Sequence, residues 1–453
     1  MVHSGTGADH DEPVWTSPWQ GPKLPHLLHL WKQYLGADGL PQLDKWLSHA
    51  LREHREFGKR DRLAYGDALF DIARFGGAAI ILEQALAANT DGEGVARLRE
   101  TAWPVDETAW KTALRNISPA VLFTWINICA GRMDEIGEAG NDRIAWWNKV
   151  RGTVPGNMVQ TIWAGIPPFM DAAFEARARR SGWTADNGTQ FLSRIHTRPP
   201  LWLRLIKPEH WPEIQKELIA AVFQVVRDGD GDAVSVKGVK SFHTVDAYQK
   251  GWVEVQDRAS QAIVDMVPLT PGQFVWDACT GAGGKAVALA ARLKNTGAVY
   301  ASDVRGWKLE DLRKRAKRAE LNNIRTFTAD ATAPQDWGVQ IHKHGGFDHV
   351  LVDAPCTGTG TWRRNPDSRW RMTPAFMSEM TALQERLIDA GAKAVRGGGT
   401  LLYATCSWLV DENEAIVDKF LARTPGWTIE NMSMHGAPQI DADTMFGALL
   451  RKT

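Results

Sequence analysis

The chain has 453 residues, more than one hydrophobic core usually holds, so two or three domains are expected. With 44% hydrophobic and 23% charged residues the composition is that of a globular protein, which argues against a disordered or fibrous chain. The formal net charge is zero, so no overall field advertises a nucleic acid or membrane partner, and any such surface must be local.

Residues 1–23 are polar and rich in Pro and Gly, which predicts a loose tail rather than a signal peptide. From residue 24 to residue 154 the pattern is helical. Leu43, Trp46, Leu47, Ala50 and Leu51 share one helical face. We therefore predict an all-helical domain at 24–154.

Residues 155–254 mix helix and strand signals, which predicts a small α+β subdomain. In RDGDGDAVSVKG (227–238) the spaced acids resemble a calcium loop, but Ala233 and Val239 stand where that loop requires Gly and Glu. The four cysteines (Cys129, Cys279, Cys356, Cys406) include no C-x-x-C pair. We therefore expect no metal site, a reducing compartment and, because no apolar run reaches about 18 residues, a cytoplasmic protein without a membrane partner.

Residues 255–453 alternate strand-like and helical segments. The strand-like segments are FVWDAC (274–279), AVYASD (298–303), FDHVLVDAPC (347–356) and TLLYATC (400–406). Such alternation predicts an α/β domain with a doubly wound, mostly parallel sheet, whose ligands lie outside the carboxyl ends of the strands. Three of the cysteines then lie on that edge, whereas Cys129 lies in an apolar helical run and is expected to fill a core.

A glycine-rich turn follows the first of these strands and predicts a cofactor site. The residues expected to contact the cofactor here are Cys279, Thr280, Gly281, Ala282, Gly283, Gly284 and Lys285. Asp303 ends the next strand and can accept both ribose hydroxyls, Asp330 can face the adenine, and Asp353 completes the site. Gly281, Gly283 and Ala286 also satisfy G-x-G-x-x-A, so a nicotinamide-dependent oxidoreductase is an alternative. The absence of a strand-end histidine and the presence of two cysteines favour S-adenosylmethionine.

Several motifs together resemble the RNA cytosine-C5 methyltransferases of the Nol1/Nop2/Sun family. They are Asp277-Ala-Cys-Thr-Gly-Ala-Gly-Gly-Lys285, Asp353-Ala-Pro-Cys-Thr-Gly-Thr-Gly360, Ala404-Thr-Cys-Ser407 with Glu412-Asn-Glu414, VQDRASQ (255–261) and RRNPDSRW (363–370). The resemblance covers about residues 200–453 and implies the class I S-adenosylmethionine-dependent methyltransferase fold, Rossmann-like in its sheet. Ala282 departs from it, because the family usually has proline there.

The resemblance also implies roles for the catalytic residues. Cytosine C5 is a poor nucleophile until a thiolate adds to C6, and the adduct must later lose its C5 proton and expel the thiol. In the family the Thr-Cys cysteine, here Cys406, adds to C6, and the Pro-Cys cysteine, here Cys356, assists release. DNA cytosine methyltransferases use a Pro-Cys thiol as nucleophile, so the reverse assignment stays open. Asp353 is expected at the N3/N4 edge of the cytosine, and Lys285 near the base.

The expected partner is RNA, bound by a monomer. In WRRNPDSRWR (362–371) basic and aromatic residues interleave, so Arg363, Arg364, Arg369 and Trp370 are predicted to contact RNA. Residues 46–74 resemble the NusB-related helical domain of bacterial small-subunit ribosomal RNA methyltransferases, which favours ribosomal over transfer RNA. A non-catalytic RNA-binding assembly factor is an alternative of another class, but the chain keeps Cys356, Cys406, Asp303 and Asp353, which such a factor would not need.

Overall fold

The computed structural model describes residues 23–238, 242–333 and 335–453, so the predicted tail lies outside the described residues except for Lys23. The chain separates into two compact units, Met1–Gly165 and Ile166–Thr453. The helical domain predicted at 24–154 ends before helix α8 (Met158–Trp163), which belongs to the first unit. Among the described helices, none is long and apolar enough to cross a membrane.

The first unit is helical. Its helices are α1 (Leu24–Gly36), α2 (Leu43–Glu53), α3 (Lys59–Ala87), α4 (Gly92–Ala102), α5 (Glu107–Asn116), α6 (Pro119–Ala130), α7 (Asn141–Val150) and α8 (Met158–Trp163). Helix α3 is buried along most of its length and packs against α4 and α6. The side chains of Trp103, Trp110, Trp125, Trp146 and Trp147 are buried here, so many of the chain's tryptophans fill a core.

The second unit begins with two helices, α9 (Asp171–Arg180) and α10 (Ala185–Ile195), and a four-stranded antiparallel sheet. The sheet has the order β2-β3-β1-β4 and is formed by β1 (Leu201–Leu205), β2 (Gln224–Arg227), β3 (Ala233–Lys237) and β4 (Val253–Val255). Helices α11 (Trp211–Ala220) and α12 (Asp246–Gln249) accompany it. Leu203, Ile214, Leu218, Val234 and Val253 lie in its separate small core.

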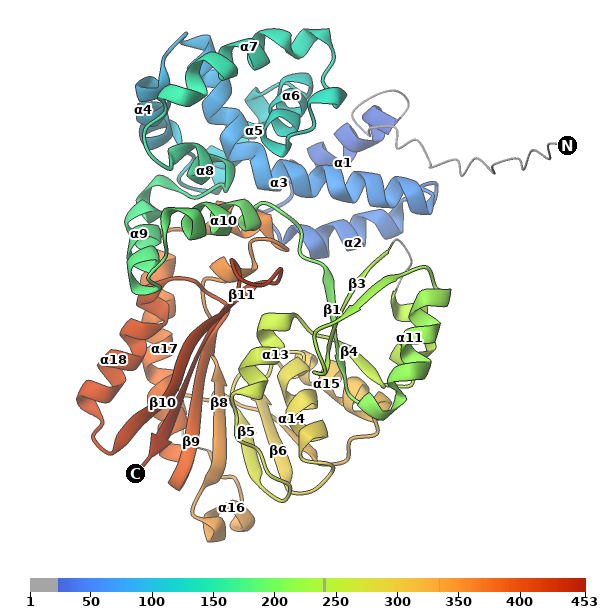
Figure 1. Ribbon diagram of the computed structural model, residues 1–453, viewed down its shortest axis with the longest axis vertical. Coiled ribbons are helices and arrows are strands. Elements are labelled where there is room, and N and C mark those ends of the chain that lie inside the picture. The colour runs from blue at the N-terminus through green and yellow to red at the C-terminus, as the bar shows by residue number, and fades with distance from the viewer. Residues whose placement is uncertain (1–22, 239–241, 334) are drawn as a thin grey trace, which may run out of the picture. The chain divides into compact units, whose positions relative to one another are not determined.

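A seven-stranded sheet forms the rest of the second unit, in the order β10-β11-β9-β8-β5-β6-β7 (Figure 1). Its strands are β5 (Phe274–Asp277), β6 (Ala298–Asp303), β7 (Ile324–Thr328), β8 (Phe347–Asp353), β9 (Val395–Thr405), β10 (Trp427–Gly436) and β11 (Thr444–Lys452). Strands β5 to β9 are parallel, and the β10–β11 hairpin adds β11 antiparallel to β9. The predicted doubly wound α/β sheet is confirmed, and this hairpin is an addition that the sequence did not predict.

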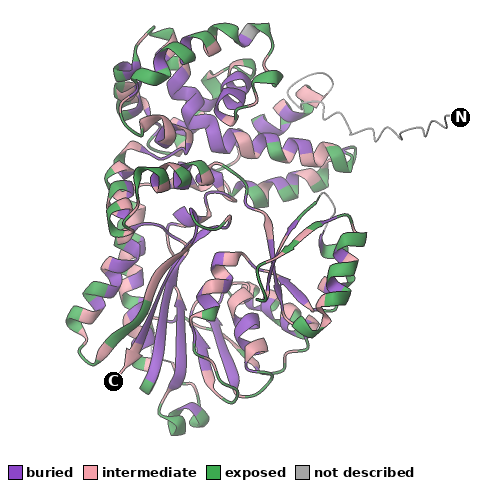
Figure 2. Cartoon of the chain, viewed as in Figure 1, coloured by how far each residue is buried: buried purple, intermediate pink, exposed green. Residues whose placement is uncertain are grey.

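Helices cover both faces of this sheet. On one face the core includes residues of α17 (Pro374–Ala394) and α18 (Glu414–Arg423), and α16 (Val339–His344) lies at its margin. On the other face it includes residues of α13 (Arg258–Asp265), α14 (Gly284–Arg292) and α15 (Gly306–Arg318). The central strands are accordingly buried on both sides, as their nearly continuous colour in Figure 2 shows.

Candidate active site

The candidate site lies where strand order reverses. The chain runs from β5 to β6 and β7 on one side, then crosses to β8 and β9 on the other. Ligands of open α/β sheets bind outside the carboxyl ends of the strands at such a point. Asp277, Asp303 and Asp353 end β5, β6 and β8, and Cys406 directly follows β9.

The two strand-end thiols are close together. Cys356 Sγ and Cys406 Sγ are 3.3 Å apart, although the residues lie on different loops. Both residues are half-buried and both are free thiols. The hydrogen bond to Cys406, burial and the nearby Cys406 and Glu412 charges raise the pKa of Cys356 well above its ordinary value. These causes favour the protonated form of the Cys356 thiol.

A lysine–aspartate pair lies in the same site. Lys285 Nζ, on the first turn of α14, donates to Asp353 Oδ2 at 2.6 Å. Burial by itself would lower the pKa of Lys285, but the charge and hydrogen bond of Asp353, followed by the Cys406 charge, raise it. Electrostatic attraction is mutual, so the Lys285 ammonium group stabilises a thiolate at Cys406. The Asp353 Oδ1 atom has no partner among the described residues and is available to a substrate.

The glycine turn between β5 and α14 is shaped for close approach of a ligand. Gly281 and Gly283 have positive φ angles of 54° and 83°, and a Cβ on Gly283 would lie 2.3 Å from Leu312 Cδ1. Thr280 N–H donates to Ser302 O, and Gly281 N–H donates to Asp303 Oδ2. Ala282 carries no ring that would restrict the turn, and its carbonyl accepts from Arg315.

Asp303 is arranged to accept hydrogen bonds. It is 4% exposed, and its carboxylate accepts from Gly281 N–H and from the backbone and guanidinium of Arg305. Burial opposes its ionisation, but the bonds from Arg305 and Gly281 outweigh burial and lower the pKa of Asp303. The half-exposed Arg305 side chain therefore bonds to the atoms that ribose hydroxyls would need, and a cofactor must compete with it.

Asp277 is a site residue that the sequence analysis quoted but did not select. It is 1% exposed, its Oδ2 accepts from Thr280 Oγ1, and its Oδ1 makes no hydrogen bond to the described residues. Burial and the nearby Asp353 charge raise the pKa of Asp277 to about 7. A buried carboxylate oxygen without a donor, beside a glycine turn, fits the ammonium group of an amino-acid moiety. Its position at the end of β5 was the available sequence signal.

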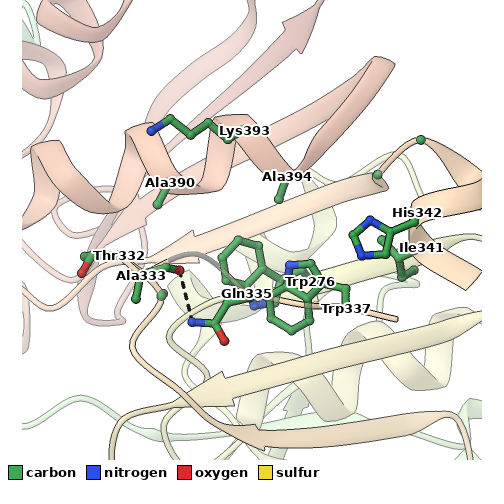
Figure 3. A pocket seen from close by; sticks show the side chains of 13 residues that line it. Trp276, Thr332, Ala333, Gln335, Trp337, Ile341, His342, Ala390, Lys393 and Ala394 are labelled. Carbon is green, nitrogen blue, oxygen red and sulfur yellow. Dashed lines mark hydrogen bonds between the residues drawn. The ribbon is translucent and has the colours of Figure 1, made fainter. Parts of the chain in front are cut away.

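Cys279 and Asp330 have less direct positions. Cys279 is half-buried, and burial raises its pKa well above the ordinary value, so it is an unreactive neighbour of the turn. Asp330 is exposed, and Oδ1 accepts from Thr332 N–H and Thr332 Oγ1 of its own turn. The residues after this turn line a cavity of about 510 Å³ (Figure 3). Trp276 of β5, Trp337 of the loop before α16 and residues of α17 also line it. The cavity is separate from the thiols, since neither cysteine lines it.

Three of the four predicted RNA contacts in residues 363–370 are buried side chains. Arg363, Arg369 and Trp370 are 2%, 2% and 3% exposed, so they are not available to a nucleic acid. Arg363 bonds to Asp441 and to the carbonyl of Ala442, and Arg369 donates to Ile195 O and stacks on Trp362. The half-buried Arg364 is paired with Asp257 and Asp443. These arginines hold loops together around the site, a role that residue type alone cannot distinguish from phosphate binding.

Comparison with known proteins agrees with this geometry. Residues 265–449 match the family described as 16S rRNA methyltransferase RsmB/F. A probable ribosomal RNA small subunit methyltransferase B of Synechocystis is 37% identical over 183 residues, which are 40% of this chain and 40% of that protein. The matched part spans about half the length of other small-subunit methyltransferase B relatives.

Solved structures agree on the fold. The crystal structure of PH0851 aligns with 90% of this chain and 94% of its own at a TM-score of 0.66 and 23% identity. NSun6 from Pyrococcus horikoshii, solved with SFG, aligns with 62% of this chain and 98% of its own at a TM-score of 0.53 and 16% identity. These structures confirm the predicted class I methyltransferase fold, and the match over residues 265–449 confirms the family resemblance for that part of the chain.

Proposed function

We propose that this chain, whose C-terminal domain carries the RsmB/F resemblance over residues 265–449, transfers a methyl group from S-adenosylmethionine to C5 of a cytosine in RNA. The observation that carries the proposal is the pair of thiols, with Cys356 Sγ and Cys406 Sγ 3.3 Å apart beside the Lys285–Asp353 pair. Methylation at C5 needs one thiol that adds to the base and a second group that assists its release. A hydride-transferring enzyme needs neither.

The electrostatics favour Cys406 as the nucleophile. Cys356 has a raised pKa, the first cause of which is its hydrogen bond to Cys406, and the nearby Glu412 charge also opposes its ionisation. The Lys285 ammonium group, whose own pKa is raised partly by the Cys406 charge, stabilises the Cys406 thiolate. The thiolate is the reactive form of a cysteine. The reverse assignment would require Cys356, whose pKa is raised, to ionise and add to the base first.

Addition to the base uses the free oxygen of Asp353. The Cys406 sulfur forms a bond to C6, and the electron pair of the C5–C6 double bond moves so that C5 becomes nucleophilic. Asp353, held by Lys285 through Oδ2, can accept from the cytosine amino group through Oδ1 and favour protonation at N3. These two residues thus orient the base and stabilise the charge of the addition.

Release reverses the addition. A base removes the C5 proton, the double bond forms again, and Cys406 leaves as a thiolate. Once Cys406 is bonded to carbon it is neutral, so the principal cause of the raised Cys356 pKa is gone. Cys356 then loses its own proton to solvent water more readily, and the resulting thiolate can take the C5 proton. The order of ionisation therefore follows the order of the reaction.

S-adenosylmethionine is the cofactor, and it supplies a methyl group on a positively charged sulfur. Asp303 would accept from its ribose hydroxyls, the glycine turn at residues 280–284 would lie against it, and Asp277 Oδ1 would accept from its ammonium group. NSun6 from Pyrococcus horikoshii, a relative in fold, was solved with SFG. Asp330, the other predicted contact, would face the adenine.

Small-subunit ribosomal RNA is the proposed substrate because the relatives named above are ribosomal RNA small subunit methyltransferases. Since Arg363, Arg369 and Trp370 are buried, phosphate contacts must come from other cations. Lys314 and Lys317 are exposed on the basic helix α15 and are candidates for these contacts. We also propose that the helical first unit, which resembles a NusB-related domain, contributes to RNA binding.

The test offers the full chain and labelled S-adenosylmethionine to unmodified small-subunit ribosomal RNA, assembled subunits and transfer RNA. The RNA is then digested, and the methylated nucleoside is identified by mass. We expect 5-methylcytidine in the ribosomal RNA or in the subunit, and none with Cys406→Ala. Methylation of transfer RNA alone would overturn the substrate class, and a chain that binds RNA but transfers nothing would favour the assembly-factor alternative.

A further inference from the structure

Glu412 is a fully buried acid next to the thiols. It ends a short 3-10 helix, η10 (Val410–Glu412), six residues after Cys406, and it is 0% exposed. Its Oε1 accepts from Thr357 N–H at 2.8 Å and from Gln384 Nε2 at 3.0 Å, and its Oε2 accepts from Thr357 Oγ1 at 2.5 Å. All three partners are donors, which is the arrangement that an ionised carboxylate requires.

No cation neutralises this carboxylate among the residues that the structure describes. The other buried acid of the segment, Glu414, forms a bidentate pair with Arg177 at 2.7 Å, whereas the partners of Glu412 are an amide, a hydroxyl and a side-chain amide. A buried charge without a counter-ion is costly and rare unless it has a task. One effect of this charge is on the neighbouring thiol, because Glu412 is among the charges that raise the pKa of Cys356.

Neighbouring residues hold the other thiol loop. Asn413 Oδ1 accepts from Thr405 Oγ1 at 2.5 Å and Asn413 Nδ2 donates to Ser407 O at 2.9 Å, so Asn413 bonds to both sides of Cys406. Tyr403 Oη donates to the carbonyl of Glu412 at 2.6 Å. Adjacent residues therefore bond to the two loops, with Glu412 holding the Cys356 loop and Asn413 holding the Cys406 loop.

We propose that Glu412 is a positioning residue that holds Cys356 beside Cys406 and, through its negative charge, keeps Cys356 a protonated thiol until the base has been methylated. The role of Glu412 in the reaction rests on the proposed function, whereas its effect on the pKa of Cys356 does not. While Cys406 is a thiolate, the Glu412 charge prevents Cys356 from ionising in its place. After Cys406 has bonded to the base, the same charge makes the Cys356 thiolate a stronger base for the C5 proton.

The first experiment measures the ionisation of Cys356 without RNA or cofactor. The full chain carrying Cys406→Ala, alone and with Glu412→Gln, is alkylated with iodoacetamide over a range of pH, and Cys356 modification is followed by peptide mass. Removing the charge lowers the Cys356 pKa, so we expect the alkylation midpoint to fall by about one pH unit and the rate below it to rise about tenfold. An unchanged midpoint overturns the inference. The midpoint reports ionisation, and it does not depend on how accessible the sulfur is.

Two matched controls separate charge from general damage. Glu412→Asp retains the charge, and its midpoint should remain near the parent value. Asp348→Asn removes another buried carboxylate, which lies near the opposite end of β8, about 17 Å along the strand from Asp353. It should leave the Cys356 midpoint unchanged, and a fall equal to that of Glu412→Gln would contradict a specific role.

A second variant gives an effect of opposite sign and covers the case in which Glu412→Gln does not fold. Thr357→Val removes one donor to Glu412 and leaves the carboxylate less compensated, so the Cys356 midpoint should rise by a few tenths of a unit. A fall overturns the inference. With both cysteines present, Glu412→Gln should accumulate more RNA–protein adduct than the wild type. Because alkylation needs no methyl transfer, the failure of the proposed function would leave the alkylation result intact.

Discussion

Asp303→Asn tests the cofactor site, and its effect can be worked out from the hydrogen bonds. The buried carboxylate accepts from Gly281 N–H with Oδ2 and has a second oxygen, now bonded to Arg305, for a ligand. Asparagine has the same size but no charge, and its amide group offers one acceptor where two are needed. A hydrogen bond to a charged group contributes about 1.5–3 kcal/mol. Since about 1.4 kcal/mol is a tenfold change in affinity, the loss of one such bond weakens binding roughly 10- to 100-fold.

The assay is calorimetric titration of S-adenosylmethionine into the full chain, which needs no RNA. Asp336→Asn is the matched control, because this acid is exposed and bonds to Gly338 N–H and His342 nearby, and it should change the affinity by less than about threefold. Arg305→Ala should act in the opposite direction and tighten binding, since the ribose hydroxyls no longer compete with the guanidinium. An Asp303→Asn chain that binds within threefold of the wild type would refute this assignment of the ribose site.

Three further predictions concern other parts of the site. Asp277, with a pKa of about 7, is protonated below that pH, so S-adenosylmethionine affinity should increase as the pH rises through about 7, and this dependence should disappear in Asp277→Asn. Arg363→Met removes the donor to the buried Ala442 carbonyl and one of the arginines that pair with Asp441, so the thermal midpoint should fall by several degrees, while the salt dependence of RNA binding stays unchanged. Hydrogen peroxide should convert the two thiols 3.3 Å apart to a Cys356–Cys406 disulfide and two waters, which peptide mapping detects, and a thiol reductant should restore methyl transfer.

The positions of the strand-end groups could be predicted from the sequence because parallel strands end at one edge. The glycine turn follows β5, Asp303 ends β6, and the two cysteines follow β8 and β9. Identifying the strands in the sequence therefore predicts that these groups lie at the same edge of the sheet. Cys356 and Cys406 lie close together because β8 pairs with β9. The alternation of strands and helices predicts a parallel sheet, but it does not determine which strands are neighbours.

The arginines after the Pro-Cys turn could not be assigned from sequence. An exposed Arg that binds phosphate and a buried Arg that bonds to carbonyls have the same local pattern, and only the distant partners decide. For Arg363 these partners are Thr197, Asp441 and Ala442, which are far away in the chain. Glu412 was quoted within a motif, but its role depends on Thr357 and Gln384, which belong to other elements.

The β10–β11 hairpin was missed for a related reason. Strand β10 lies at the edge of the sheet and is mostly exposed, so its residues lack the continuous apolar run that identified the buried strands. The partner strand β11 is buried, but within residues 427–453, all of which the structure describes, no helix separates it from β10 or follows it, so the alternation of strands and helices does not indicate it.

The central claim is that Cys406 bonds to the base and Cys356 releases it. The direct test incubates wild type, Cys356→Ala and Cys406→Ala with S-adenosylmethionine and unmodified bacterial RNA, then separates the products on a denaturing gel. The account predicts that Cys356→Ala accumulates a denaturant-stable RNA–protein adduct and that Cys406→Ala forms none. An adduct in Cys406→Ala but not in Cys356→Ala would reverse the two roles and contradict the account.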